Sequence, residues 1–351
     1  MITIFNLSLT FLTALVGGAL LFKLKVPGGM MVGAIVSVMI LSITSGAAYM
    51  PSLAKAAAQC LAGAFIACGI GRNDLKNISK LRGPLLVLLL SLLLVNLVLG
   101  FLIWLCSPLD MLTAMLCAVP GGMSDTPIIA ADLGADAGKV AILQFVRMSA
   151  GIGIFPSLIL LLSRDEAGSS AEVSQSTQEN GGRESRRVPA FLMTLAAAFC
   201  FGGLGKLSGI PAGTLVFAMF GVIALKLLTG CAYLPIYAKR LAQVLSGAYI
   251  GCGISGTDLL ELNHLILPAI LILAGYFLNS ILTGRLLRRL FGFPLRAAML
   301  IATPAGASDM ALISSDLGVE SREVIELQII RMVLVISIFP QIIVAVSGCF
   351  R

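Results

Sequence analysis

The 351-residue sequence is short of charge, histidine and tryptophan. Asp, Glu, Lys and Arg make up only 12% of it, whereas soluble domains carry about 25%. One histidine excludes a His-rich metal centre, and none of the eight cysteines forms a CxxC pair. The sequence also shows no nucleophile paired with a base. We therefore expect no catalytic residue, no bound metal, no cofactor and no enzyme activity.

Apolar residues dominate instead, at 58% of the chain with a mean hydropathy of +1.02. Runs of about 20 apolar residues are long enough to cross a bilayer as helices. The sequence predicts ten such spans: 3–22, 28–46, 53–71, 84–106, 138–162, 189–206, 212–230, 237–255, 265–286 and 322–349. No Lys or Arg precedes the first run, so we expect a retained helix and not a cleaved signal peptide.

The chain contains two copies of one sequence at a constant offset of 184 residues. "QCLAGAFIACGIGRNDL" (59–75) matches "QVLSGAYIGCGISGTDL" (243–259), and Pro27, for example, matches Pro211. Between the copies lies a stretch rich in Ser, Gly, Glu and Gln, the composition of a flexible linker. We therefore divide the chain into a first membrane repeat (1–162), a linker (163–188) and a second membrane repeat (189–351).

The net charge of +7 comes from basic residues that mostly lie between the apolar spans. The positive-inside rule explains this pattern, and no nucleic-acid-binding element is visible. In the first repeat the loop after the third span is basic, but in the second repeat it is the loop after the fourth. Matching loops therefore face opposite sides of the membrane. This predicts inverted-topology repeats, each with about five transmembrane helices and one re-entrant hairpin, in a bacterial inner membrane with both termini outside.

The predicted hairpins, at about 109–134 and 294–318, contain "PGGMSD" (120–125) and "PAGASD" (304–309). Inversion requires an odd number of crossings in each repeat, so these segments must enter and leave on the same side. The arms 109–119 and 123–133 would each span about half a bilayer. Broken backbone at that depth is tolerated only when it is buried or lines a wet cavity. Paired breaks in inverted repeats point to the binding site of a transporter.

Within the first break, Gly121 and Gly122 allow the turn, Ser124 is a candidate N-cap, and Gly134 is a candidate helix stop. Asp125 either complements its own helix N-terminus or binds a proton, a cation or the solute. The predicted solute- and ion-binding residues are Gly121, Gly122, Ser124, Asp125, Gln144, Arg147, Gly306, Ser308, Asp309, Gln328 and Arg331.

The span after each hairpin carries Gln-x-x-Arg, with both side chains on one helix face. A lone Arg near the bilayer centre costs several kcal/mol, so Arg147 and Arg331 need partners. Two alternatives are open: a structural ion pair with Asp125 or Asp309, or a solute carboxylate held bidentately. The repeated "GAFIACG" and "GAYIGCG" place small residues four apart, which favours close helix packing.

With its duplicated "PGGMSD…LQFVRM" and "PAGASD…LQIIRM", the sequence resembles the AbrB membrane protein family over nearly its whole length outside the linker. The architecture is similar to that of elevator-type carriers, which implies a transport domain that moves against a scaffold and a possible homodimer. We therefore expect a secondary transporter for a small organic anion, coupled to H⁺ or Na⁺. The alternatives are a non-transporting membrane sensor or regulatory protein and a channel.

Overall fold

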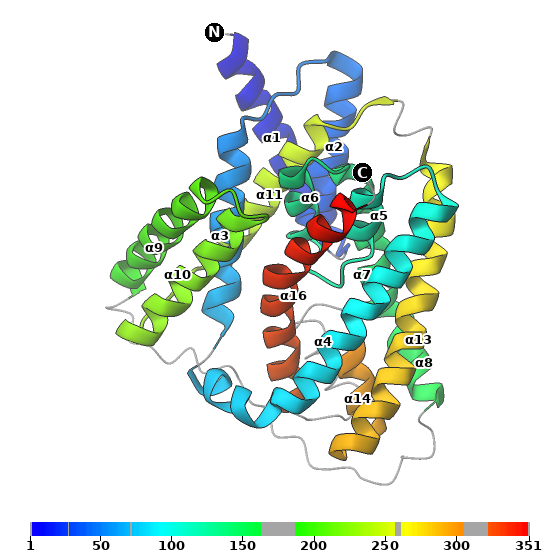
Figure 1. The fold of residues 1–351 in the computed structure, drawn as a ribbon. Coiled ribbons are helices and arrows are strands. Elements are labelled where there is room, and N and C mark those ends of the chain that lie inside the picture. The colour runs from blue at the N-terminus through cyan, green and yellow to red at the C-terminus, as the bar shows by residue number, and fades with distance from the viewer. Residues whose placement is uncertain are drawn as a thin grey trace.

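The computed structural model describes residues 2–26, 28–70, 72–162, 187–256, 261–304 and 322–349, and the regular elements in these ranges are all helices (Figure 1). They are α1 (Ile2–Lys23), α2 (Gly29–Ser45), α3 (Ser52–Gly69), α4 (Arg72–Cys106), α5 (Met111–Cys117), α6 (Thr126–Leu133), α7 (Ala137–Gly153), α8 (Phe155–Leu162), α9 (Arg187–Leu207), α10 (Gly213–Thr229), α11 (Ile236–Cys252), the 3₁₀ helix η3 (Glu261–Leu265), α13 (Ile266–Phe291), α14 (Leu295–Ala302) and α16 (Arg322–Gly348).

Six helical segments in the described ranges are long and apolar enough to cross a membrane. They are Thr3–Lys23, Ser52–Gly69, Leu81–Cys106, Val188–Leu207, Leu262–Phe291 and Glu323–Gly348. Three further predicted spans are the 17-residue helices α2, α10 and α11. That length lies at the lower limit of about 17 residues for a helix that crosses the hydrocarbon core. The predicted all-α polytopic membrane fold is confirmed.

The predicted span 138–162 differs, because it consists of two helices, α7 and α8. Pro156 cannot donate a backbone hydrogen bond, and its ring crowds the carbonyl four residues earlier. Gly151 and Gly153 weaken the same turn, since Gly lowers helix stability by about 1 kcal/mol relative to Ala. In the second copy Pro340 lies inside the uninterrupted α16, where neither glycine is present. The proline breaks the helix only where glycines accompany it.

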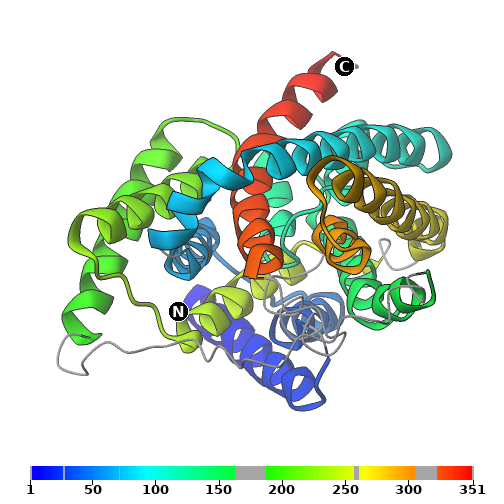
Figure 2. The ribbon, with the colours of Figure 1, turned by 90° about the horizontal axis from the view of Figure 1, so that it is seen from below.

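The helices pack into two groups with dense contacts inside each group and sparse contacts between them. The first helix group contains α1, α2, α3, α9, α10 and α11. The second helix group contains α4, α5, α6, α7, α8, α13, α14 and α16, and it encloses the largest hydrophobic core. Figure 2 shows α9 and α10 (green, left) and α13 (gold, right) on opposite sides of α16 (red). Residues of α6 and α16 share a core with α3 and α10, so these two helices line the boundary between the groups.

Two glycines at matching positions let helices of the first group approach closely. A Cβ on Gly63 would lie 2.5 Å from the Leu215 carbonyl oxygen of α10. A Cβ on Gly247 would lie 2.7 Å from the Met31 carbonyl oxygen of α2. Both distances are too short for any side chain, so backbone packs directly on backbone. The packing role predicted for "GAFIACG" and "GAYIGCG" is confirmed at these positions.

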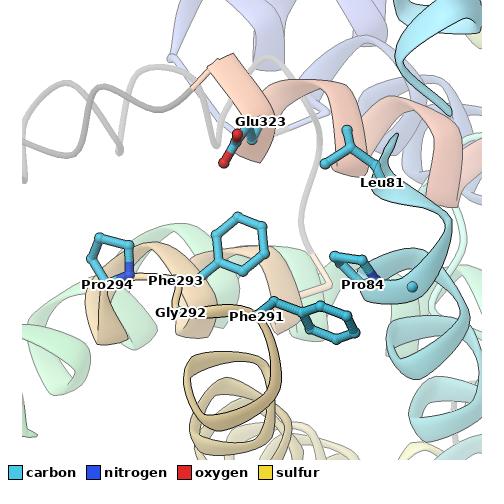
Figure 3. A pocket seen from close by; sticks show the side chains of 8 residues that line it. Leu81, Pro84, Phe291, Gly292, Phe293, Pro294 and Glu323 are labelled. Atoms are coloured by element: carbon cyan, nitrogen blue, oxygen red, sulfur yellow. The ribbon is translucent and has the colours of Figure 1, made fainter. Parts of the chain in front are cut away.

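Helices α4 and α13 pack against each other and run in opposite directions (Figure 1). The start of α4 and the end of α13 meet at the lower end of the molecule in that view, where they line a pocket of about 380 Å³. Figure 3 shows Leu81 and Pro84 of α4 facing Phe291 and Phe293, with Glu323 of α16 beside them. None of the predicted binding residues within the described ranges lines this pocket. The start of α1 and the end of α16 lie toward the other end (Figure 1).

Candidate functional site

The first predicted break separates α5 from α6 at residues 118–125. Helix α5 begins after Asp110, whose carboxylate accepts a hydrogen bond from the Thr113 backbone N–H at 3.0 Å, and all of its residues are buried. Helix α6 ends at Gly134, which has the left-handed φ of 77° that suits glycine, as predicted. Both arms are shorter than predicted, because α5 ends at Cys117 and α6 begins only at Thr126. The non-helical backbone is therefore wider than the "PGG" tip.

Helix α7 supplies hydrogen-bond donors to the C-terminal end of α5. A helix leaves its last four carbonyls without partners and carries partial negative charge there. Gln144 donates from Nε2 to the Val119 carbonyl at 3.0 Å and more weakly, at 3.4 Å, to two carbonyls of the last turn of α5. Arg147 donates from Nη1 to the Val119 carbonyl and from Nη2 to the Gly121 carbonyl at 2.6 Å. The Gln-x-x-Arg pair thus caps a broken helix.

This geometry bears on the ion-pair alternative for Arg147. The residue is 2% exposed, and its hydrogen-bond partners are backbone carbonyls and not the Asp125 carboxylate. The described residues thus contain no Arg147–Asp125 ion pair, and Asp309, the other predicted partner, lies outside them. Carbonyl dipoles compensate the buried charge because they converge at the negative end of α5. The sequence could not show this, since it does not reveal which way the broken backbone turns its carbonyls.

The second copy repeats the arrangement. Gln328 donates from Nε2 to the Leu300 and Thr303 carbonyls at 2.8 and 3.2 Å, and Arg331 donates from Nη1 to the Thr303 carbonyl at 3.0 Å. Each of these donors, and Thr303 as the shared acceptor, lies 184 residues after its counterpart. Gly306, Ser308 and Asp309 lie outside the described residues.

Tyr276 of α13 joins the two caps and was not singled out by the sequence. It is fully buried, its hydroxyl donates to the Ala118 carbonyl, and the Arg147 Cζ lies 6.0 Å from its ring centroid. Arg147 and Arg331 are close enough to interact electrostatically with each other and with Tyr276. The two Gln-x-x-Arg helices therefore converge on one buried place in the second helix group. Tyr276 has a Leu at the matching position of the first copy, so repetition gives no signal for it.

Ser124 and Asp125 occupy the end of the break, where α6 begins. The predicted N-cap role of Ser124 is wrong, because Asp125 holds the N-cap position, and it makes no side-chain capping bond there. The Ser124 hydroxyl instead accepts a hydrogen bond from Nε2 of Gln243 at 3.2 Å. Asp125 is only 8% exposed, and its Oδ2 folds back over Gly122, where a Cβ would lie 2.2 Å away. Glycine at 122 is thus needed to seat this carboxylate.

Two residues of α11 reach the break from the first helix group. Besides Gln243, Lys239 lies close enough to act electrostatically on Asp125. Sequence reasoning missed both. The available signal was their repetition, since Lys55 and Gln59 occupy the matching positions on α3. The site therefore lies at the boundary of the two helix groups.

The structure thus brings together Gly121, Gly122, Ser124, Asp125, Gln144 and Arg147 around the first break, and Gln328 and Arg331 beside the second. No group of three or more His, Cys, Asp and Glu residues in the described ranges could hold a metal ion.

The sequence is similar to a known protein family and to two curated bacterial proteins. Residues 31–347 match the family described as "Transition state regulatory protein AbrB". The chain is 26% identical over 321 residues to "Putative regulator AbrB" of Escherichia coli (strain K12), which covers 90% of this chain and 89% of that protein. It is 27% identical over 263 residues to "Uncharacterized protein YhjN" of Bacillus subtilis (strain 168), which covers 72% of this chain and 68% of that protein.

Proposed function

The chain belongs to the AbrB family. From its duplicated helix ends, we propose that this protein is a secondary active transporter of elevator type for a small organic anion. The transporter works in the bacterial inner membrane and couples solute movement to H⁺ or Na⁺. The observation that carries the proposal is one hydrogen-bond arrangement that recurs at the ends of α5 and α14, at positions 184 residues apart. A helix that ends at membrane depth needs other partners for its last carbonyls, so the repetition of this arrangement favours a functional cause.

The arrangement of the helices supports an inverted orientation of the two repeats. Helices α4 and α13 hold matching positions in the two copies, yet they run in opposite directions (Figure 1). The segments after the third span of the first copy and the fourth span of the second meet beside the pocket of Figure 3. Both segments are basic, so the positive-inside rule assigns this end to the cytoplasm. The termini would then face outside.

In the proposed mechanism, the solute binds at the first break and at its counterpart in the second repeat. The start of α6 faces the break with the positive end of its helix dipole, which favours an anion. Asp125 takes up the coupling proton or Na⁺. Sparse contacts between the groups suit movement of the second helix group against the first, and the first group would form the scaffold of a homodimer.

The names of the relatives supply the second candidate, a membrane sensor or regulator that does not transport. Such a protein needs a partner protein and does not need a site that opens to both sides. The two functions differ in one measurable respect: only the transporter moves solute across a membrane that contains no other protein.

The test is purified protein reconstituted in liposomes and loaded with a panel of small carboxylates, with imposed pH or Na⁺ gradients. Accumulation of one solute above the level in protein-free liposomes supports the transporter. Asp125→Asn should abolish the dependence on the gradient, because the amide cannot bind a proton or Na⁺ as the carboxylate does. A panel that yields no uptake, from protein that remains folded, would leave the regulator as the better reading.

A further inference from the structure

Helices α3 and α11 form a crossing pair in which each helix holds a lysine over an aromatic ring of the other. The Lys55 Nζ lies 5.3 Å from the ring centroid of Tyr249, and the Lys239 Nζ lies 4.9 Å from that of Phe65. These contacts are equivalent at the offset of 184, since Lys55 matches Lys239 and Phe65 matches Tyr249. The aromatic faces help to hold two cations in helices of a membrane protein.

The two lysines differ in their acidic partners. The Lys55 Nζ lies 2.9 Å from Oδ1 of Asp132 on α6, which completes an ion pair. Lys239 and Asp125 are close enough to interact electrostatically but are not within the 4.0 Å of an ion pair. Asp125 is 8% exposed and Lys239 is half-buried. The buried Asp125 carboxylate has no ion-pair partner, which costs free energy unless a cation or a proton is bound, whereas the half-buried Lys239 is accessible to a solute.

The hydrogen-bond donors near Lys239 and Asp125 indicate the chemical class of the bound group. Both Nη groups of Arg147 donate to backbone carbonyls and its Nε is buried without a hydrogen-bond partner, so these contacts hold the guanidinium at the end of α5. The ammonium of Lys239 carries three N–H donors, lies over the Phe65 ring and forms no hydrogen bond or ion pair with another described residue. Gln243 lies four residues later on the same helix face and brings its amide to Ser124. The available cation at the break thus comes from the first helix group.

We infer that Lys239, assisted by Gln243, binds the carboxylate of the transported solute, and that Arg147 is a positioning residue that holds the break open. The inference rests on the proposed function and names the residue that recognises the solute. A cation or a proton at Asp125 would neutralise the buried carboxylate, and the solute carboxylate would pair with the half-buried Lys239. The bound solute would then contact both helix groups, which suits a carrier whose groups move relative to each other.

The experiment measures ligand-dependent thermal stability of the detergent-purified full chain. The probes are acetate, succinate and L-glutamate, each compared with its neutral amide: acetamide, succinamide and, for the side-chain carboxylate, L-glutamine. At least one carboxylate should stabilise the wild type more than its amide does. Lys239→Gln should weaken this binding about tenfold or more, since a hydrogen bond to a charged group is lost, and Lys239→Arg should retain part of it.

Lys55→Gln is the matched control, because it removes the equivalent lysine from the same helix pair. It should keep the carboxylate-dependent shift even if it lowers the stability of the empty protein. If Lys239→Gln is folded and binds the carboxylate as tightly as the wild type does, the inference is wrong while the transporter proposal stands. If no carboxylate stabilises the wild type, the anion site fails and the inference falls with it.

Discussion

Replacement of Arg147 tests whether this residue caps the broken helix. Arg147→Met removes the donors to the Val119 and Gly121 carbonyls in a site that is 2% exposed. Gln144 still donates to the Val119 carbonyl, so only the Gly121 carbonyl loses its donor, and a carbonyl left without a donor costs about 1–3 kcal/mol. Loss of the buried guanidinium removes its own desolvation penalty, so we expect the lower half of that range. Arg147→Lys can still serve one carbonyl and should lose about half as much.

The assay is thermal unfolding in detergent, where about 2 kcal/mol should lower the midpoint of this 351-residue chain by about 3 °C. Arg240→Met is the matched control. The Cζ of Arg240, on α11, lies 4.5 Å from the ring centroid of Phe22 on α1, and this contact is worth about 0.5–1 kcal/mol. The reasoning fails if Arg147→Met unfolds at the wild-type temperature. If that variant is also unable to bind any solute, the guanidinium is a ligand and not a cap.

Three further predictions concern single contacts. Gly33→Ala should lower the unfolding temperature by several degrees, because its Cβ would lie 2.1 Å from a carbonyl oxygen of α1; an unchanged midpoint would refute this close packing. Asp132→Asn should cost about 1 kcal/mol or less, since its ion pair with Lys55 is partly exposed at 14% and 28%, and the wild type should lose the same increment at high salt. Gly122→Ala should displace the Asp125 carboxylate, whose Oδ2 lies 2.2 Å from the new Cβ, and so should reduce pH- or Na⁺-dependent uptake in a folded protein; wild-type coupling would contradict the seating of Asp125.

The features that the sequence predicted well are those that depend on local composition or on repetition. Apolar length located the membrane helices, because a helix must satisfy its own backbone in lipid. The offset of 184 paired Gln144 with Gln328 and Arg147 with Arg331, and the structure gives each pair equivalent partners. Their partners were predicted less well, because the direction of a carbonyl in a broken segment depends on backbone torsions that side-chain identity does not specify.

The features that the sequence missed depend on contacts between distant segments. Gln243 meets Ser124 across 119 positions of chain, and Lys226 donates to the Cys68 carbonyl across 158. Lys239 lies in the first turn of α11, where a basic residue is ordinarily read as an interfacial anchor. Only the packing of α3 against α11 turns it toward the break. Its repetition as Lys55 was the one clue in the sequence.

Solute-evoked current through wild-type proteoliposomes on a solid-supported membrane tests the central claim most directly. The account predicts that at least one small carboxylate evokes a current that depends on pH or Na⁺. Asp125→Asn should abolish this dependence, Lys239→Gln should strongly weaken the current, and Lys55→Gln should retain it. Folded wild-type protein that gives no current and no uptake with any carboxylate, under either gradient, would contradict the assignment of this chain as a solute carrier.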